Sequence, residues 1–279
     1  MRKIAIGAVA SGALALSALA VPAASATTPD FTFSKVVVNG GTAIVVGTTN
    51  MVDVPVTYTL TRPADIVIDY KTKAAGVVLY RGSLSRVENE VGNEDAPTCT
   101  TTATTATTVT ESCKETVVID PFSLFESSDA GTWHAAGYYG RVDSDEDDSD
   151  GHVSFDYADD MWGPLASAQV KRAAKLTVNA GPEPVGKGKT LTVTGSLTRA
   201  TWYGYKDANY TGYTGRPVAL QFKAKGATAY TTVKTVTSGT SGALKTTVKA
   251  SADGTYRFSF AGTSTTGAKA ATGDYVDVK

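Results

Sequence analysis

The sequence predicts an all-β protein of two tandem immunoglobulin-like β-sandwiches behind a cleaved signal peptide. Apolar and polar residues alternate along many short runs that end in turn residues, and no long segment of the sequence has the apolar periodicity of a helix. In addition, an acidic turn followed by Gly, Thr and a large aromatic occurs at residues 129–133 and again at 253–256. Such a phrase opens a late strand of many immunoglobulin-like sandwiches, at the tyrosine corner. Two copies about one sandwich apart predict two modules.

The N-terminus has the pattern of a secretory signal. Arg2 and Lys3 precede an apolar stretch over residues 4–21, and residues 24–26 read Ala-Ser-Ala, the small residues of a cleavage site. A membrane anchor is the alternative, but the stretch is short for a bilayer span and Pro22 closes it. We therefore expect residues 1–26 to be a signal peptide and the mature protein to be secreted and extracellular.

The first module is expected over residues 27–172. Residue 55 is a proline inside an alternating run, which suggests an edge strand or a bulge. Residues 81–97 are polar and acidic and are expected to be a connection. The predicted strand segments are 31–38, 42–46, 52–60, 65–70, 77–80, 117–119, 131–141, 152–157 and 166–172.

The chain has two cysteines, Cys99 and Cys113, and they lie in or beside a threonine-rich tract. An isolated pair in an exported protein predicts one disulfide, and the spacing is not that of a Cys-x-x-Cys metal or redox pair. Nine of the thirteen residues from 98 to 110 are threonine. Because threonine favours extended backbone, we expect a hairpin here, with a disulfide-pinned low-complexity loop as the alternative.

The second module is expected over residues 173–279. Seven strands in about 107 residues match a minimal immunoglobulin-like sandwich. The predicted segments are 175–179, 190–197, 217–222, 230–236, 244–248, 256–260 and 274–278.

The second module also carries a resemblance. Residues 217–222, 232–236 and 253–258 resemble the bacterial Ig-like repeats of secreted actinobacterial proteins, and the mature chain resembles a group of exported two-module proteins of this kind. Since the shared motifs are core and turn residues, the resemblance implies a fold rather than an activity. Some relatives of this type are described as calcium-binding, which implies the same for the acidic segment described next.

Residues 143–151 are the first candidate site. Six carboxylates lie in the eight residues before Gly151, and a flexible loop rich in carboxylates can supply the oxygen ligands that Ca²⁺ prefers. The spacing is not that of an EF-hand, because Asp148 stands where that loop needs glycine. The alternative is a solvated acidic hairpin tip. The candidate metal ligands are Asp143, Asp145, Asp147, Asp148 and Asp150.

Residues 201–213 are the second candidate site. Aromatic faces beside polar groups can stack on sugar rings or anchor a protein partner. The alternative is that this loop folds back and buries some of its rings. The candidate ligand-binding residues are Trp202, Tyr203, Tyr205, Tyr210 and Tyr213.

Charge is divided unevenly between the modules. Residues 27–172 carry 10 basic against 22 acidic residues, a net charge of −12, whereas residues 173–279 carry 14 against 5, a net charge of +9. The simple interpretation is two separately solubilised domains. The alternatives are attraction between the modules or a basic face for anionic wall polymers. Because the basic residues are scattered and no arginine cluster stands out in the sequence, we expect no nucleic-acid partner.

No catalytic motif is apparent in the sequence. His134 and His152 have no metal-ligand spacing, the paired Asp159 and Asp160 are a weak signal for acid–base chemistry, and nucleophile-elbow and phosphate-loop patterns are missing. We therefore expect a secreted, non-enzymatic binding or structural protein that takes Ca²⁺ at residues 143–151. The alternative is an adhesin-like module that binds cell-envelope polysaccharide or an extracellular protein through residues 201–213.

Overall fold

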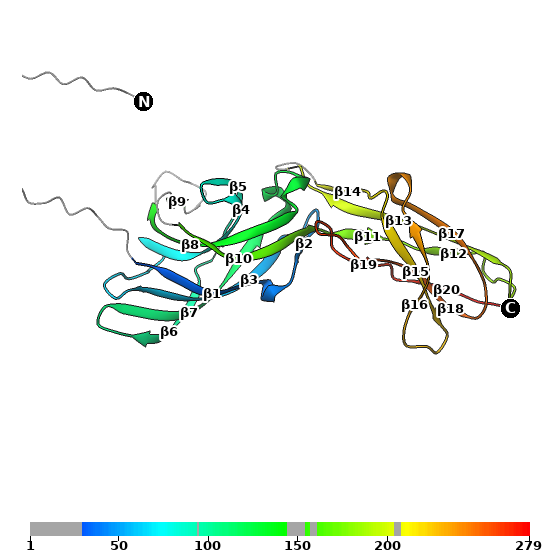
Figure 1. The fold of residues 1–279 in the computed structure, drawn as a ribbon, viewed down its shortest axis with the longest axis horizontal. Helices are drawn as coiled ribbons and strands as arrows, with labels where there is room; N and C mark the ends of the chain where they lie inside the picture. The colour runs from blue at the N-terminus through cyan, green and yellow to red at the C-terminus, as the bar shows by residue number, and fades with distance from the viewer. Residues whose placement is uncertain (1–29, 94, 144–153, 157–160, 204–207) are drawn as a thin grey trace, which may run out of the picture.

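The computed structural model describes residues 30–93, 95–143, 154–156, 161–203 and 208–279, and it is all-β, with no α-helix in that part of the chain (Figure 1). The predicted signal peptide, residues 1–26, lies outside the described residues. Within the described ranges, no helix is long and apolar enough to cross a membrane. The strands are β1 (Thr32–Val38), β2 (Ile44–Val46), β3 (Val52–Pro63), β4 (Lys73–Ser83), β5 (Arg86–Val91), β6 (Thr98–Thr104), β7 (Thr108–Ile119), β8 (Gly131–Asp143), β9 (Ser154–Asp156), β10 (Met161–Arg172), β11 (Ala174–Leu176), β12 (Asn179–Gly181), β13 (Thr190–Thr201), β14 (Asn209–Gly212), β15 (Pro217–Ala224), β16 (Thr231–Thr237), β17 (Ala243–Lys249), β18 (Gly254–Phe260), β19 (Lys269–Ala270) and β20 (Asp274–Val276), with short 3₁₀ turns at Asn39–Gly41, Pro121–Ser123, Ser127–Asp129 and Thr240–Gly242.

Strands β1 to β10 form the N-terminal sandwich. One sheet has the order β1-β3-β7-β6, and the other has the order β2-β10-β8-β4-β5, with β9 paired to β8 and β2 running parallel to β10. This partition of strands between two sheets is that of an immunoglobulin-like sandwich. Alternate residues of the strands face inward and form the core, as the period of two requires. Fully buried examples are Val54, Val56, Val77, Leu79, Val117, Ile119 and Trp133.

Three local predictions for this sandwich are wrong. Residues 65–70 do not form a strand: residues 66–69 are irregular, and the Asp69 carboxylate accepts the backbone N–H groups of residues 71–73, which closes a turn over residues 69–73. The same bonds hold the pKa of Asp69 well below its usual range. Residues 86–91 form strand β5 instead of a connection. Pro55 lies on β3, which is an inner strand, one residue beyond the stretch that pairs with β1.

Strands β11 to β20 form the C-terminal sandwich (Figure 1). The long strand β13 pairs with β12 and β17 along its first half and with β11 and β14 along its second half. The opposing sheet has the order β16-β15-β18, with β19 and β20 also on β18. All seven predicted strand segments are present, although the first is split into β11 and β12. The core residues include Leu191, Val193, Leu197, Val218, Leu220, Tyr256 and Phe258.

The repeated sequence phrase opens β8 in one sandwich and β18 in the other. In the first copy, the buried indole of Trp133 donates to the backbone carbonyl of Asp129 at 2.7 Å, a bond to the chain a few residues upstream. A tyrosine corner makes the same kind of bond with a hydroxyl, so Trp133 replaces it here. In the second copy, Tyr256 is buried and its ring packs against Phe222 with centroids 4.6 Å apart.

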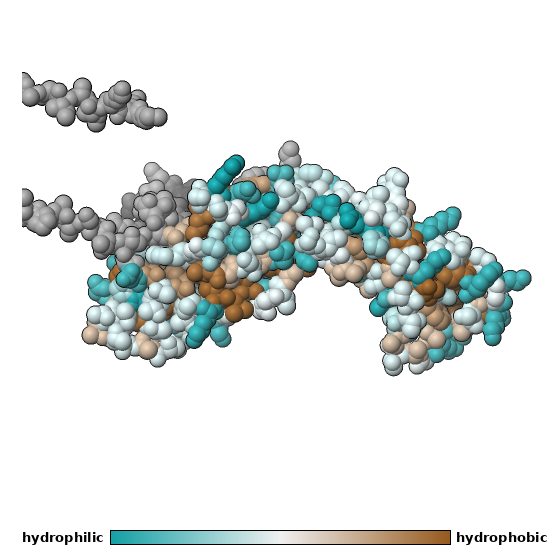
Figure 2. Space-filling model, in the orientation of Figure 1, coloured by the Kyte–Doolittle hydropathy of each residue, from teal (hydrophilic) through white to brown (hydrophobic). Residues whose placement is uncertain are grey.

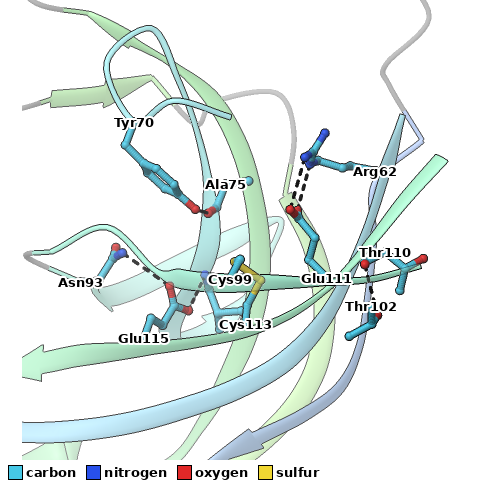
Figure 3. The surroundings of a disulfide bond; sticks show 11 residues. Arg62, Tyr70, Ala75, Asn93, Cys99, Thr102, Thr110, Glu111, Cys113 and Glu115 are labelled. Carbon is cyan, nitrogen blue, oxygen red and sulfur yellow. Dashed lines mark hydrogen bonds and ion pairs between the residues drawn. A yellow bond between two sulfur atoms is a disulfide. The ribbon is translucent and has the colours of Figure 1, made fainter. Parts of the chain in front are cut away.

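The disulfide between Cys99 and Cys113 is confirmed, as is the hairpin of the threonine-rich tract. The two cysteines are directly opposite each other on β6 and β7, with their Cα atoms 4.1 Å apart. The bridge therefore joins two neighbouring strands of one sheet, near buried polar groups of the sandwich (Figure 3).

Candidate functional site

The junction between the two sandwiches is closed by a tryptophan. Only Ala173 separates β10 from β11, and the side chain of Trp202, which follows β13, packs into the core of the N-terminal sandwich. Trp202 is 1 % exposed, and its indole N–H donates to the carbonyl of Gly47 at 2.8 Å. A residue of the second sandwich is thus part of the first hydrophobic core.

Arg172 makes a second set of contacts at the junction. This buried side chain donates to the Ala200 carbonyl through Nε and to the Thr201 hydroxyl at 2.8 Å. Its backbone pairs with the loop before β19, through bonds to Thr265 and Gly267. Burial, together with the positive charge of nearby Arg199, lowers the pKa of Arg172 to about 10. These hydrogen bonds satisfy buried polar groups from both sandwiches, which links the two units directly.

Two of the five aromatic residues expected to bind a ligand in segment 201–213 are buried. Trp202 and Tyr213 are buried, at 1 % and 5 % exposure, so neither ring is available to stack on a ligand. Tyr210 lies under the ammonium of Lys175, which is 3.8 Å from the ring centroid. Tyr203 is 46 % exposed, and Tyr205 lies outside the described residues. The alternative, that the segment folds back and buries rings, agrees with Trp202 and Tyr213.

A cleft of about 380 Å³ lies beside this contact. It is lined by Lys175 and Tyr210 of one sandwich and, in the other, by Val45, Gly47, Thr48, Thr49, Asn50 and Val52. Figure 2 shows that polar residues cover much of the visible face of both sandwiches, with apolar areas on each of them.

Arg199, Tyr213 and Arg216 form a second feature, which we call the arginine–tyrosine cluster. The guanidinium carbon of Arg199 lies 4.0 Å from the Tyr213 ring centroid, and that of Arg216 lies 4.6 Å from it. Both distances are within the range of a cation–π interaction. The sequence analysis missed this cluster because its members are separated along the chain and are brought together by β13 and the loop before β15.

The two neighbouring guanidiniums shift the pKa values of the residues in the cluster. Partial burial lowers the pKa of Arg199, and the guanidinium of Arg216 lowers it too, although Tyr213 acts in the opposite direction. Burial raises the pKa of Tyr213, but the hydroxyls of Thr263 and Thr266 and the two guanidiniums outweigh it, so the pKa is lowered overall. Among the described residues, neither arginine has a carboxylate within ion-pair distance.

The acidic segment lies mostly beyond what the structure describes. Asp143 ends β8, and its backbone pairs with Ser154 of β9 in antiparallel register. The candidate ligands Asp145, Asp147, Asp148 and Asp150 are outside the described residues. In the described ranges, no group of three metal-ligating side chains comes together.

A buried carboxyl group, which the sequence analysis also missed, lies between the sheets of the N-terminal sandwich. Glu115 is 7 % exposed; it accepts the Val77 N–H at 2.8 Å and the Asn93 amide at 3.4 Å (Figure 3). Burial raises the pKa of Glu115 to about 8, against the lowering effect of the Val77 bond. The hydroxyl of Tyr58 is also buried, and it has no hydrogen-bond partner in the part of the chain that the structure describes. A sequence signal was present, since Glu115 occupies an inward position in the alternation of β7.

The described histidine, His134, lies beside a serine hydroxyl. His134 Nδ1 lies 3.1 Å from the Ser167 hydroxyl on an exposed part of the sheet. An activated serine needs a base that is itself oriented by a third group. Over the described ranges, the side chain of His134 has no hydrogen bond or ion pair to a carboxylate. His152, Asp159 and Asp160 lie outside those ranges.

Comparison with known proteins adds little to this picture. The chain matches no protein-family model and no curated protein sequence. Among solved structures, it is similar to a marsupial T cell receptor, at 12 % identity over 88 % of this chain and 73 % of the receptor chain, with a TM-score of 0.32. It is also similar to the ectodomain (Ig1–Ig3) of mouse nectin-like molecule 4, at 13 % identity over 90 % of this chain and 64 % of that one, with a TM-score of 0.21. The assignment of immunoglobulin-like sandwiches rests on the strand order and pairing of this chain.

Proposed function

We propose that this chain is a secreted, non-enzymatic protein that acts outside the cell as one two-domain binding unit. The observation that carries the proposal is the packing of Trp202 from the C-terminal sandwich into the core of the N-terminal one. Two further features support it: a disulfide, which is typical of oxidising compartments, and a sequence pattern at residues 2–26 that is typical of export.

A fixed junction has a physical consequence for binding. A partner that contacts both sandwiches does not have to order them first, so less conformational entropy is lost on association. The partner classes that fit an extracellular protein of this kind are a cell-envelope polysaccharide or another extracellular protein. In this proposal the contact uses both domains, not the aromatic segment alone.

The proposal is tested by retention of the mature protein, residues 27–279, on insoluble cell-envelope polysaccharide and on immobilised envelope proteins. We expect retention on one of these materials and a reduction of at least tenfold in Trp202→Ala, measured under conditions where both sandwiches are folded. The variant Tyr203→Ala tests the alternative, because Tyr203 is an exposed ring of the aromatic segment. The proposal is contradicted if Tyr203→Ala loses retention while Trp202→Ala keeps it, or if the wild type is not retained on any of these materials.

A second function in this proposal is Ca²⁺ binding by residues 143–151. The supporting observation is the antiparallel pairing of Asp143, the first residue of the acidic segment, with Ser154, which lies three residues beyond the segment. Carboxylates held in one connection between paired strands can share a cation, with the weak affinity of extracellular sites, about 10⁻⁴–10⁻³ M.

Isothermal titration calorimetry of the mature protein tests the calcium site. We expect saturable heat with millimolar Ca²⁺ that disappears in the double variant Asp145→Asn/Asp147→Asn. The matched control is Asp53→Asn/Asp65→Asn, which removes the same charge at two exposed positions and should keep the heat. An absence of binding heat in the wild type, or equal loss in both double variants, is the contrary result.

A further inference from the structure

We infer that the arginine–tyrosine cluster of Arg199, Tyr213 and Arg216 is a binding site for an oxyanion, either a carboxylate or a phosphate group. The inference rests on the proposed binding role, because it names the chemistry that an extracellular partner would present to the C-terminal sandwich. It does not depend on the calcium site.

The cluster is held in place by the fold before any ligand arrives. Arg199 lies on β13, while Tyr213 and Arg216 lie in the short connection between β14 and β15. The Tyr213 N–H donates to the Leu197 carbonyl at 2.9 Å. The Ser238 hydroxyl donates to the Tyr213 carbonyl at 2.6 Å and accepts the Arg216 N–H at 2.9 Å. One buried serine thus fixes the backbone on both sides of the connection, and such preorganisation favours binding.

The cluster has hydrogen-bond donors that remain unused. A guanidinium has five N–H donors, whose fork matches the oxygens of a carboxylate or phosphate. Among the described residues, the buried Arg216 Nε has no hydrogen-bond partner. Because buried polar groups in proteins are nearly always paired, this unpaired donor points to a ligand.

Other arginines of the chain show that an unpaired cluster is unusual here. Arg62 is paired with Glu111 at 2.9 Å, and Arg81 is paired with Asp129 at 3.0 Å. Arg257 also stacks on a tyrosine, at 3.7 Å from the Tyr230 ring centroid, but its Nε donates to the Gln221 side chain at 2.8 Å. Arg199 and Arg216 also stack on a tyrosine, Tyr213, but their guanidinium groups have no hydrogen-bond acceptor among the described residues.

The charge of the surroundings selects an anion. Arg172 lies close enough to Arg199 for the two positive charges to disfavour each other. The C-terminal half, residues 173–279, carries a net charge of +9. An oxyanion beside the two guanidiniums would offset this repulsion and accept charge-assisted hydrogen bonds from both of them.

Nuclear magnetic resonance of the arginine Nε–H groups tests the inference on the full mature chain. Sodium phosphate and sodium glucuronate are titrated separately at constant ionic strength, so that the phosphate and carboxylate sources are distinguished. We expect saturable shifts of the Arg199 and Arg216 signals with at least one of the two probes. Replacing either residue by lysine keeps the charge but loses the fork, so Arg199→Lys and Arg216→Lys should weaken binding of that probe at least tenfold.

Arg257→Lys is the matched control, because it changes an arginine that also lies on a tyrosine but has a hydrogen-bond acceptor. It should leave the affinity of the probe unchanged. Shifts with neither probe, or equal weakening in the Arg257 variant, overturn the inference. Retention of the protein on envelope material is a separate readout, so failure of the oxyanion site and failure of the proposed binding role are distinguishable.

Discussion

Replacing Trp202 by alanine removes the contact that joins the two sandwiches. The side chain is 1 % exposed and packs with the core of the N-terminal sandwich, so its loss leaves a large cavity there. Truncation of a buried tryptophan typically costs about 3–5 kcal/mol. The variant also leaves the partly buried Gly47 carbonyl without the indole N–H that it accepts at 2.8 Å, and loss of this bond adds at most about 1–3 kcal/mol. We take about 3–5 kcal/mol as the total, since the two effects overlap.

The loss should be visible in how the mature protein unfolds. Because Trp202 belongs to one sandwich and packs in the core of the other, the wild type should unfold in urea as one cooperative transition. In Trp202→Ala the N-terminal sandwich loses part of its core, and two separate transitions should appear. Circular dichroism and tryptophan fluorescence measure this, with Tyr203→Ala as the control because it changes the next, exposed residue and should shift stability by less than about 0.5 kcal/mol.

The reasoning is refuted if Trp202→Ala loses less than about 1 kcal/mol, or if the wild type already unfolds in two transitions that the variant leaves unchanged. A further variant, Trp202→Phe, separates packing from hydrogen bonding. It keeps most of the apolar contact and should lose clearly less than the alanine variant.

Three further predictions concern the N-terminal sandwich. Burial raises the folded-state pKa of Glu115 from 4.5 to about 8, so the folded state binds the proton more tightly and the unfolding free energy falls as pH rises from about 4.5 to 8. The slope is at most about 1.4 kcal/mol per pH unit, and Glu115→Gln should remove it. Urea melts at several pH values measure the slope, and an unchanged slope in the variant contradicts the prediction. Reduction of the Cys99–Cys113 bridge, which closes a sequence separation of 14, should lower the unfolding free energy by about 3 kcal/mol, and equal urea midpoints with and without reductant would count against this. Trp133→Phe removes the indole bond to Asp129 and should cost about 1–3 kcal/mol in the same assay, whereas wild-type stability would show that the bond contributes nothing.

The strands could be predicted from the sequence wherever apolar residues alternate on a buried face. Val54 and Val56 on β3 and Leu191 and Val193 on β13 are buried at every second position, as the pattern indicates. The segment 65–70 also has apolar residues, but the local hydrogen bonds of Asp69 close a turn over residues 69–73. Pattern alone cannot weigh an alternating run against a side chain that closes the backbone.

The missed strand β5 shows the opposite case. Its residues from Arg86 to Glu88 are exposed, and only Asn89 and Val91 are buried, so the apolar signal is weak. Pairing with β4 supplies the stabilisation that the sequence pattern does not display.

The site could not be predicted because its contacts are distant in sequence. Trp202 and Gly47 are 155 residues apart, and no local pattern connects them. The aromatic segment 201–213 has the composition of a surface binding site, but a tryptophan that closes a domain junction and one that stacks on a ligand can stand in the same local sequence. Likewise, Arg199 and Arg216 approach one tyrosine only after β13 and the β14–β15 connection are folded.

The central claim, that Trp202 joins the two sandwiches into one unit, is tested most directly by hydrogen exchange of its indole N–H in the mature protein. The account predicts that this proton, which is donated to Gly47 at 2.8 Å, exchanges only when the N-terminal sandwich opens, at the rate of its slowest core amides. Exchange of the Trp202 indole at the rate of a solvent-exposed tryptophan would contradict the claim.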